Sequence, residues 1–422
     1  MAIYLNNVGG TIELVSGNAP ARIYYGGGGT SGNFKPADVS RAGELNGFLI
    51  DLGGDNYSVK FDDLVINGYS PTTLEFASEA LQALFSQTPY TPPPLILEYD
   101  IAGNIPYTTL EDWNSFFDLP TYGLPFTSVE IQGRSVYLRG GKGIEVASNL
   151  FNGDTTLLSV SDGAYCITSA ESSAFFGCSN LITVSMPSLQ TAGDLCFRGC
   201  TSITSFYLLS LQNAGGECFR DCTSMTSFYL PSLQNAGESG CFQSCTSATS
   251  FNLPLLQSAS NSCFGGCASV TSFNLPLLEI AGVKCFGFCS DAITFDLPLL
   301  QSAGASCFQG CTSATSFNLP LLEITDNECF YNCTSTTSFD FPSLKYINGA
   351  GCFNSCLSAT SFYLPSVINL GESVESNNVF KSIVGNTISL TIPSALMTCN
   401  AGEPDGDIVD LQTYNTVTIN LV

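Results

Sequence analysis

A short pattern of apolar and polar residues recurs along the second half of the chain. The consensus C-F-x-x-C-T-S-x-T-S-F-x-L-P-x-L extends from about residue 174 to residue 367. Its second cysteine recurs in steps of 22 residues, with two steps of 23, at Cys178, Cys200, Cys222, Cys245, Cys267, Cys289, Cys311, Cys333 and Cys356. Nine near-identical units of this length predict a solenoid in which each unit forms one coil.

Each unit contains a segment with the period of a β-strand. Phe273 and Leu275 are expected to point into the core, and Ser272 and Asn274 are expected to point outward. Pro276 ends the strand because it has no N–H to donate to the next coil. Stacking the coils would join these strands into one parallel sheet with a spacing of about 4.8 Å.

The remainder of each unit returns the chain to the next strand. The C-F-x-x-C segment is expected to form a short helical turn with both cysteines and the phenylalanine inside. Gly282 has equivalents in five other units, and Asp326 and Asn348 replace it elsewhere. Because glycine, asparagine and aspartate tolerate positive φ best, the position predicts a left-handed turn. The five equivalent glycines are Gly193, Gly215, Gly237, Gly304 and Gly371.

Degenerate units flank the regular repeat. Residues 149–160 and 166–178 look like imperfect first coils, and residues 379–393 look like a degenerate tenth unit. The last nine residues, YNTVTINLV, are expected to add a closing strand. The sequence therefore predicts a leucine-rich-repeat solenoid over 149–393 and a C-terminal cap over 394–422.

The segment before the repeats predicts two further parts. Residues 1–87 read as a small β-rich anchoring domain with short strands and one helix, for which Thr72 and Glu75 form a capping box. Residues 88–95 form a stiff proline-rich linker. Residues 96–148 read as an adaptor that starts the solenoid, with a helix around Trp113 capped by Thr108 and Glu111, and strands near 129–131 and 135–138. The predicted fold class is mainly β.

The repeat resembles the BspA-type leucine-rich repeat, whose pattern is roughly A-F-x-x-C-x-x-L-x-x-I-x-L-P. The segment from Ser173 to Cys178 keeps the family's alanine before phenylalanine, whereas most units carry cysteine there. The resemblance covers about 194 residues directly. It implies surface adhesion and binding of proteins or glycans.

Charge and composition exclude several classes of function. The chain carries 12 basic and 36 acidic residues, a formal net charge of −24. Nucleic-acid binding and binding to an anionic membrane surface both need basic residues, so neither is expected. The first residues lack the features of a secretory signal, and no stretch is apolar enough to insert in a membrane. We therefore expect folding in a reducing cytoplasm.

The residue types also limit catalysis and metal binding. The chain has no histidine, which removes most nucleophile systems and zinc sites. The 19 cysteines favour a reduced, buried ladder over disulfides between coils, and a metal site is the least favoured alternative. The glycine run 26–29 lacks the spacing of a phosphate-binding loop, and Asp405, Asp407 and Asp410 lack that of a calcium loop, which predicts a solvated acidic loop. No cofactor and no metal are expected.

Two outward columns on the strands are the candidate binding residues. Hydroxyl and amide groups beside tyrosine rings suit a glycan or a protein surface, although the same residues can simply solvate an exposed sheet. Thr204, Thr226 and Thr249 share the parity of the phenylalanines and are expected to point inward, which argues against an ice-binding threonine array. One column is Ser205, Ser227, Ser250, Ser272, Thr294, Ser316, Ser338 and Ser361. The other, which contains the candidate site residues, is Tyr207, Tyr229, Asn252, Asn274, Asp296, Asn318, Asp340 and Tyr363.

These features together predict a non-enzymatic structural or binding protein. Two carboxylates such as Asp296 and Asp340 would lie about 10 Å apart by coil spacing, a little too far for a glycosidase pair. The layout of anchor, linker and repeat is loosely like that of a bacteriophage fibre or decoration protein, made in the host cytoplasm and displayed on the virion. Its expected partners are other virion proteins or further copies of itself, and a host glycan or protein. The alternative is a BspA-like adhesin on the surface of a bacterium or protist.

Overall fold

The computed structural model describes six strand segments within residues 3–76, and then residues 94–117, 124–141, 143–163, 165–370 and 378–422. The chain divides into two compact units, Met1–Pro92 and Pro93–Val422. In the first unit, one antiparallel sheet has the order β1-β2-β3-β6, and β4 pairs with β5. These strands are β1 (Ile3–Val8), β2 (Thr11–Ser16), β3 (Ala19–Tyr25), β4 (Leu49–Asp51), β5 (Tyr57–Val59) and β6 (Pro71–Phe76).

The prediction of a helix in the first unit is wrong for the residues that the structure describes. Strand β6 covers the residues where the capping box Thr72 and Glu75 predicted the first helical turn, and Glu75 lies opposite Arg22 of β3. Two consecutive β-branched threonines after a proline favour an extended backbone, and strand pairing outweighs the capping pattern. The rest of the predicted helix, the glycine run 26–29 and residues 88–93 of the linker lie outside the described residues.

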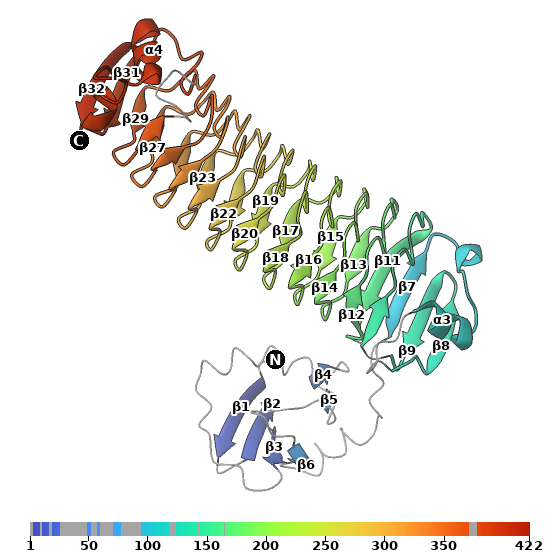
Figure 1. Ribbon diagram of the computed structural model, residues 1–422. Coiled ribbons are helices and arrows are strands. Elements are labelled where there is room, and N and C mark those ends of the chain that lie inside the picture. The colour runs from blue at the N-terminus through green and yellow to red at the C-terminus, as the bar shows by residue number, and fades with distance from the viewer. Residues whose placement is uncertain are drawn as a thin grey trace. The chain divides into compact units, whose positions relative to one another are not determined.

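The second unit begins with three antiparallel strands that extend the first sheet of the solenoid. Strands β7 (Leu95–Tyr99), β9 (Ser135–Arg139) and β8 (Ser128–Gln132) follow β11 (Leu157–Asp162) in that sheet, which confirms the predicted strands at 129–131 and 135–138. Helix α3 (Leu110–Phe116) lies beside these strands (Figure 1), and its Trp113 is buried. Its cap is Thr109, whose hydroxyl accepts the N–H of Asp112 at 3.2 Å, so the predicted cap stands one residue too early. A short 3₁₀ turn, η2 (Ala102–Asn104), precedes the helix.

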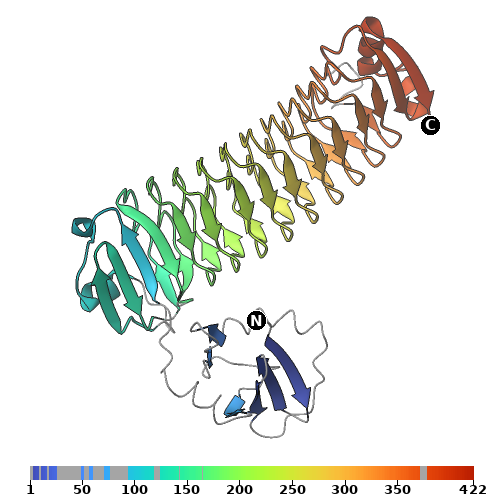
Figure 2. The same cartoon turned by 180° about the vertical axis from the view of Figure 1, so that it is seen from behind.

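The repeats form coils that follow one another along the unit (Figure 1 and Figure 2). The predicted S-F-x strands are present and parallel, with register partners such as Ser250 and Ser272. Their hydrogen-bonded sheet is interrupted between β15 and β17, β21 and β23, and β25 and β27, so the prediction of one unbroken sheet is wrong. The strands are β13 (Thr183–Ser185), β15 (Ser205–Tyr207), β17 (Ser227–Tyr229), β19 (Ser250–Asn252), β21 (Ser272–Asn274), β23 (Thr294–Asp296), β25 (Ser316–Asn318), β27 (Ser338–Asp340), β29 (Ser361–Tyr363) and β31 (Thr387–Ile392).

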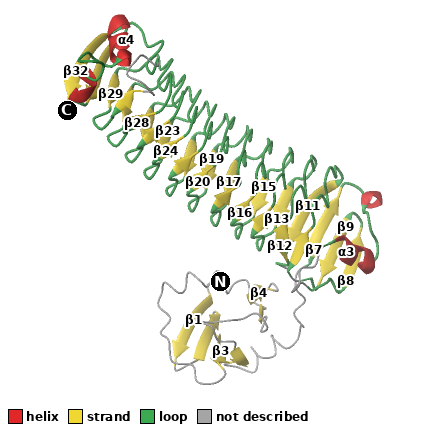
Figure 3. Cartoon of the chain, viewed as in Figure 1, coloured by secondary structure: helices red, strands yellow, loops and turns green. Residues whose placement is uncertain are grey.

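A second parallel sheet, which the sequence did not predict, is continuous. It has 11 short strands, one from each successive coil, placed where the chain was expected only to turn back (Figure 3). The second residue of most of these strands is a buried alanine, which allows the strands to approach the core closely. The strands are β10 (Ile144–Val146), β12 (Ile167–Ala170), β14 (Thr191–Ala192), β16 (Asn213–Ala214), β18 (Asn235–Ala236), β20 (Ser258–Ala259), β22 (Ile280–Ala281), β24 (Ser302–Ala303), β26 (Ile324–Thr325), β28 (Tyr346–Ile347) and β30 (Asn369–Leu370).

Two stacks of phenylalanine rings fill the interior. The C-F-x-x-C phenylalanines lie with ring centroids 5.0–5.7 Å apart and nearly parallel, from Phe151 to Phe380. The strand phenylalanines, Phe206 to Phe362, form a second stack with spacings of 5.0–6.2 Å. Rings of the two stacks meet edge to face, which is a favoured aromatic geometry. The inward orientation predicted for Phe273 and Leu275 is confirmed.

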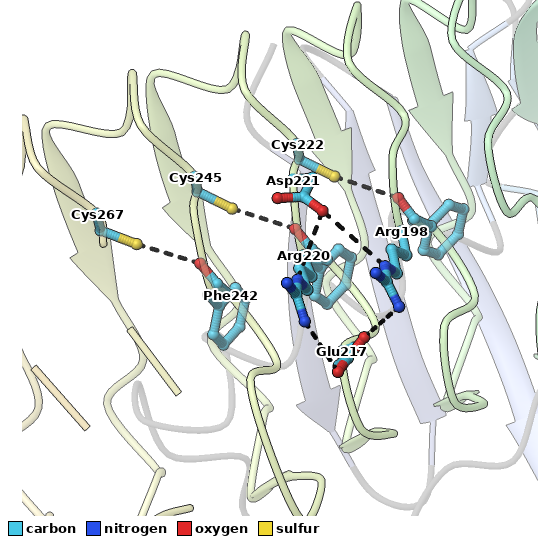
Figure 4. Close-up of polar contacts among 10 residues, drawn as sticks. Arg198, Glu217, Arg220, Asp221, Cys222, Phe242, Cys245 and Cys267 are labelled. Atoms are coloured by element: carbon cyan, nitrogen blue, oxygen red, sulfur yellow. Dashed lines mark hydrogen bonds and ion pairs between the residues drawn. The ribbon is translucent and has the colours of Figure 1, made fainter. Parts of the chain in front are cut away.

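Two columns of cysteines line these stacks. All 19 cysteines are free and 18 are buried, which confirms the reduced ladder. The second cysteine of each repeat donates its thiol hydrogen to a phenylalanine carbonyl of the preceding coil, as Cys245 does to Phe219 and Cys267 to Phe242, both at 3.1 Å (Figure 4). A small apolar residue that also donates a hydrogen bond fits this position better than alanine. Burial raises the pKa of Cys352 to about 12 and that of Cys245 well above its usual range.

The left-handed residues of each coil lie beside the cysteines, and the predicted position was wrong. Gly193 and Gly282 do not have positive φ; a Cβ there would come within 2.6 and 2.7 Å of backbone nitrogens of the preceding coil. Of their equivalents, Gly237 has positive φ, and Gly371 lies outside the described residues. Positive φ recurs instead just before each cysteine, as at Leu195 and Gly199. Because two left-handed residues interrupt it, the C-F-x-x-C segment forms turns rather than the expected short helix.

An ion-pair network joins two neighbouring coils on the side of these turns. Arg198 and Arg220 both contact Glu217, at 2.5 and 3.0 Å, and both reach Asp221 (Figure 4). The guanidinium of Arg198 also lies 5.8 Å from the centre of the Phe176 ring. The four charges cancel, so this network fastens the coils without leaving a charged site.

The C-terminal cap closes the solenoid as predicted. Strand β32 (Thr416–Leu421) pairs in parallel with β31, and Phe380 stacks on Phe353 at 5.7 Å. Along the chain, η3 (Ser394–Met397) and helix α4 (Gly406–Tyr414) lie between β31 and β32.

The acidic residues of the cap are not a solvated loop. Asp405 is buried and caps α4, and buried Asp407 accepts the N–H of Val379 at 2.8 Å. Asp410 is exposed on the same helix. The prediction failed because the carboxylates complete backbone hydrogen bonds at the end of the solenoid. Burial raises the pKa of Asp405 to about 6.

Replacing Phe264 by alanine tests the ring stack. Phe264 lies between Phe242 and Phe286, with centroids 5.5 and 5.3 Å away, so we expect the free energy of unfolding to fall by about 3–5 kcal/mol. Urea unfolding followed by circular dichroism measures it. The control is Phe288→Gly, which removes an exposed ring at a position where φ is 62°, a value that glycine adopts without strain. This variant should not lower the free energy of unfolding. Equal losses for both variants would contradict the buried stack.

Thiol titration tests the cysteine ladder. With Ellman's reagent, the native full chain should react at one thiol, the exposed Cys399, because the other 18 thiols are buried out of reach of the reagent. After denaturation all 19 should react. Rapid reaction of several thiols in the folded protein would refute the buried ladder.

The cap predicts a pH dependence. The raised pKa of Asp405 means that the folded state binds the carboxyl proton more tightly than the unfolded state does. Protonation of Asp405 therefore stabilises the fold fully below about pH 4, and this stabilisation is lost as the pH rises through about 6. Asp405→Asn keeps the capping oxygen without the titration. We expect equal stability at pH 4 and a variant more stable by about 1–3 kcal/mol at pH 7, measured by thermal unfolding. A constant difference across this range would contradict the prediction.

Candidate functional site

The candidate site is one exposed face of the solenoid, which we call the strand face. It consists of the outward residues of strands β15 to β29, and the structure places both predicted columns on it in register. In β21, for example, Ser272 and Asn274 are exposed on either side of the buried Phe273. The eight predicted site residues therefore lie in one row along the coils.

Tyrosines stand near both ends of this row. Tyr207 and Tyr229 are 51% and 55% exposed on neighbouring coils, and Tyr363 is 42% exposed on the last of these strands. So much exposure is unusual for an aromatic ring on a sheet, and it leaves the ring available for contact.

Amide and carboxylate groups fill the middle of the row. Asn274 donates its side-chain N–H to the Oδ1 of Asn252 at 2.8 Å, and Asn318 donates to the Oδ1 of Asp296 at 2.6 Å. Asp340 is exposed on the next coil. These pairs fix the orientation of the amides before any ligand arrives.

A third column on this face was predicted to point inward, and that prediction is wrong. Thr204, Thr226 and Thr249 are exposed, as are the equivalent residues of the other coils. Thr249 donates its hydroxyl to the carbonyl of Thr226 at 3.0 Å, and five such bonds join neighbouring coils. The column is Ile182, Thr204, Thr226, Thr249, Thr271, Ile293, Thr315, Thr337 and Thr360.

The sequence held a signal for this column that simple alternation missed. The strand begins one residue later, at the serine, so the threonine belongs to the bend before it. The residue before the threonine, such as Ile203 or Val270, is apolar and buried. An apolar residue three positions before the phenylalanine breaks the period of two, and places the threonine outside.

The electrostatics of the strand face are simple. Its three columns contain two carboxylates, Asp296 and Asp340, and no lysine or arginine. They lie on strands separated by one coil, which carries Asn318. The face is therefore weakly acidic and mostly neutral.

The described residues offer little for catalysis or metal binding. Burial raises the pKa of thiols such as Cys245, which disfavours the nucleophilic thiolate. No group of three or more acidic or cysteine side chains among the described residues could hold a metal ion. Within the same residues, no helix has the length and apolar character needed to cross a membrane. Lys142 lies outside the described residues.

Two concave features accompany these surfaces. A shallow, open depression begins at the N-terminal end of the strand face and is lined by Leu158, Asn180, Ile182, Ser202 and Ser224. A hollow of about 300 Å³ lies at the C-terminal cap, where Lys381, Asp407 and Tyr414 are among its lining residues. One of these lining residues, Asp407, accepts the backbone N–H of Val379 and so belongs to the hydrogen bonds of the cap.

Comparisons with known proteins agree with the repeat pattern. The profile of the BspA type leucine rich repeat region matches residues 145–271 and 257–382. A comparison with curated proteins gave no match.

Several solved structures are similar to this chain at low sequence identity. A leucine-rich repeat protein from Bacteroides ovatus is 18% identical with a TM-score of 0.31, and the match covers 70% of this chain and 90% of that one. The T. pallidum leucine rich repeat protein is 20% identical with a TM-score of 0.33, over 52% and 90%. A leucine rich cell surface protein from Faecalibacterium prausnitzii is 16% identical with a TM-score of 0.34, over 68% and 96%.

These findings do not support the predicted likeness to a bacteriophage virion protein, whereas the family match favours the alternative. The matched residues cover more than half of the chain and coincide with the stacked coils. The chain belongs to the BspA-type leucine-rich repeat family.

Proposed function

We propose that this chain is a non-enzymatic adhesin-like protein that uses its strand face to bind a partner at a cell surface. The observation that carries the proposal is the face itself. Three columns of exposed side chains run in register over successive coils, and the described remainder of the unit leaves them uncovered.

The residue types on the face support binding rather than catalysis. Exposed tyrosines bury much area with little loss of side-chain entropy, and the paired amides are fixed beforehand. The chain has no histidine, and the two carboxylates of the face lie on strands separated by a whole coil. A rigid repeat that presents a long array suits a multivalent contact.

The cell-surface assignment is supported by the family, in which such repeats are associated with adhesion. It replaces the virion hypothesis, which the family match does not support. The partner is a glycan or a protein of another cell.

The experiment measures adhesion of beads coated with the full chain to a panel of bacterial and eukaryotic cells. We expect the double variant Tyr207→Ala/Tyr229→Ala to adhere about tenfold less, because exposed aromatic anchors dominate such contacts. The matched control is Tyr346→Ala, which removes a 40% exposed tyrosine from strand β28 of the other sheet.

Retention of the fold in both variants is checked by circular dichroism. Unchanged adhesion of the double variant, or an equal loss in the control, would rule out the strand face as the contact surface.

A further inference from the structure

The strand face presents more acceptors than donors. Each bonded threonine uses its single hydroxyl hydrogen within the protein, as Thr249 and Thr271 do at 3.0 and 3.2 Å, so its oxygen can meet a ligand only as a hydrogen-bond acceptor. Asp296 and Asp340 add carboxylate acceptors. A matching ligand must therefore be rich in hydrogen-bond donors, and it would lose little entropy on the protein side because these rotamers are held.

The charge of the face narrows the ligand further. Without a lysine or arginine in the three columns, the face cannot neutralise a polyanion, which the net charge of −24 would also repel. Two carboxylates over the eight coils of the face are too few to form a binding site for a polycation. The ligand that fits is neutral.

The repetition of the face points to a polymer. A serine or threonine hydroxyl of the first column recurs on every coil of the face, and a threonine of the third column recurs on seven of the eight coils, at a spacing of about 4.8 Å. A linear chain with regularly repeated hydroxyl groups can contact several coils at once and gain avidity without a deep pocket. An ordered lattice of water molecules fits less well, because Tyr207, Tyr229 and Tyr363 protrude from the face.

The N-terminal end of the face supplies an anchor. Tyr207 and Tyr229 stand on the coils that also provide Ser202 and Ser224 to the shallow depression. An exposed phenol ring offers a flat apolar surface on which the C–H face of a pyranose can stack, while its hydroxyl stays wet. The depression, which the same two coils line with Ser202 and Ser224, offers room for a further sugar.

From these contacts we propose that the strand face binds a neutral polysaccharide with a linear backbone, which lies along the coils and stacks on Tyr207 and Tyr229. This inference rests on the proposed function and adds the chemical class of the partner.

Affinity electrophoresis of the full chain tests it. The strongly acidic protein migrates readily in native gels, and each gel contains one soluble polymer: hydroxyethyl cellulose, xyloglucan, mixed-linkage β-glucan, galactomannan or xylan. We expect retardation by at least one of these polymers, and little by the polyanion alginate. Stronger retention by alginate would overturn the proposal, as would migration unaffected by every neutral polymer.

Matched variants locate the contact. Tyr207→Ala/Tyr229→Ala should weaken retardation about tenfold, and Thr249→Val/Thr271→Val should weaken it several-fold because valine keeps the shape but lacks the acceptor oxygen. The controls are Tyr346→Ala and Thr191→Val, which change exposed residues of the same types on the second sheet. Loss of retardation in the controls, or none in the strand-face variants, would refute the site.

The two proposals fail differently. If the tyrosine variant loses cell adhesion while no neutral polymer retards the wild type, the strand face binds a protein and only the polysaccharide is wrong. If neither adhesion nor retardation depends on these tyrosines, the proposed function falls as well.

Discussion

The structure depends on the contact between identical side chains of successive coils. Each coil contributes one phenylalanine to each of two ring stacks and one thiol that bonds to the coil before it. No single coil can bury these groups alone, so the stability of each coil comes from its neighbours. A coil whose core residues shifted by one position would lose ring stacking with both neighbouring coils. This requirement accounts for the uniform sequence of the repeat.

This interior also determines the face that we assign to binding. Because the phenylalanines stack in register, the residues on either side of them form straight outward columns. Outward positions are free of packing constraints, and they vary accordingly: tyrosine, asparagine and aspartate occupy the same place on different coils. A constant core with a variable exterior is the arrangement expected of a binding scaffold.

The sequence predicted the features that depend on repetition and burial, including the coil length, the inward Phe273 and Leu275, the cysteine ladder and the closing strand. Features that depend on backbone detail were missed. Gly282 was assigned to a turn, whereas a Cβ there would lie only 2.7 Å from the backbone nitrogen of Asn261, which excludes a side chain. Two-residue strands such as β22 are too short to show a period, so the second sheet had no sequence signal.

The candidate site was predicted in part for the same reason. The alternation of apolar and polar residues predicted the outward positions of Tyr207 and Asn274 correctly. It predicted wrongly that Thr249 points inward, because the alternation was extended one residue beyond the start of the strand. The chemistry of the third column, an outward oxygen whose hydrogen is used internally, follows from a hydrogen bond between coils that no single repeat reveals.

The most direct test of the strand face as the contact surface is hydroxyl-radical footprinting of the full chain bound to a cell or polymer that retains it. Tyr207, Tyr229 and Tyr363 should become protected while Tyr346, on the second sheet, remains as reactive as in the free protein. Protection of Tyr346 with the three strand-face tyrosines still reactive would contradict the account.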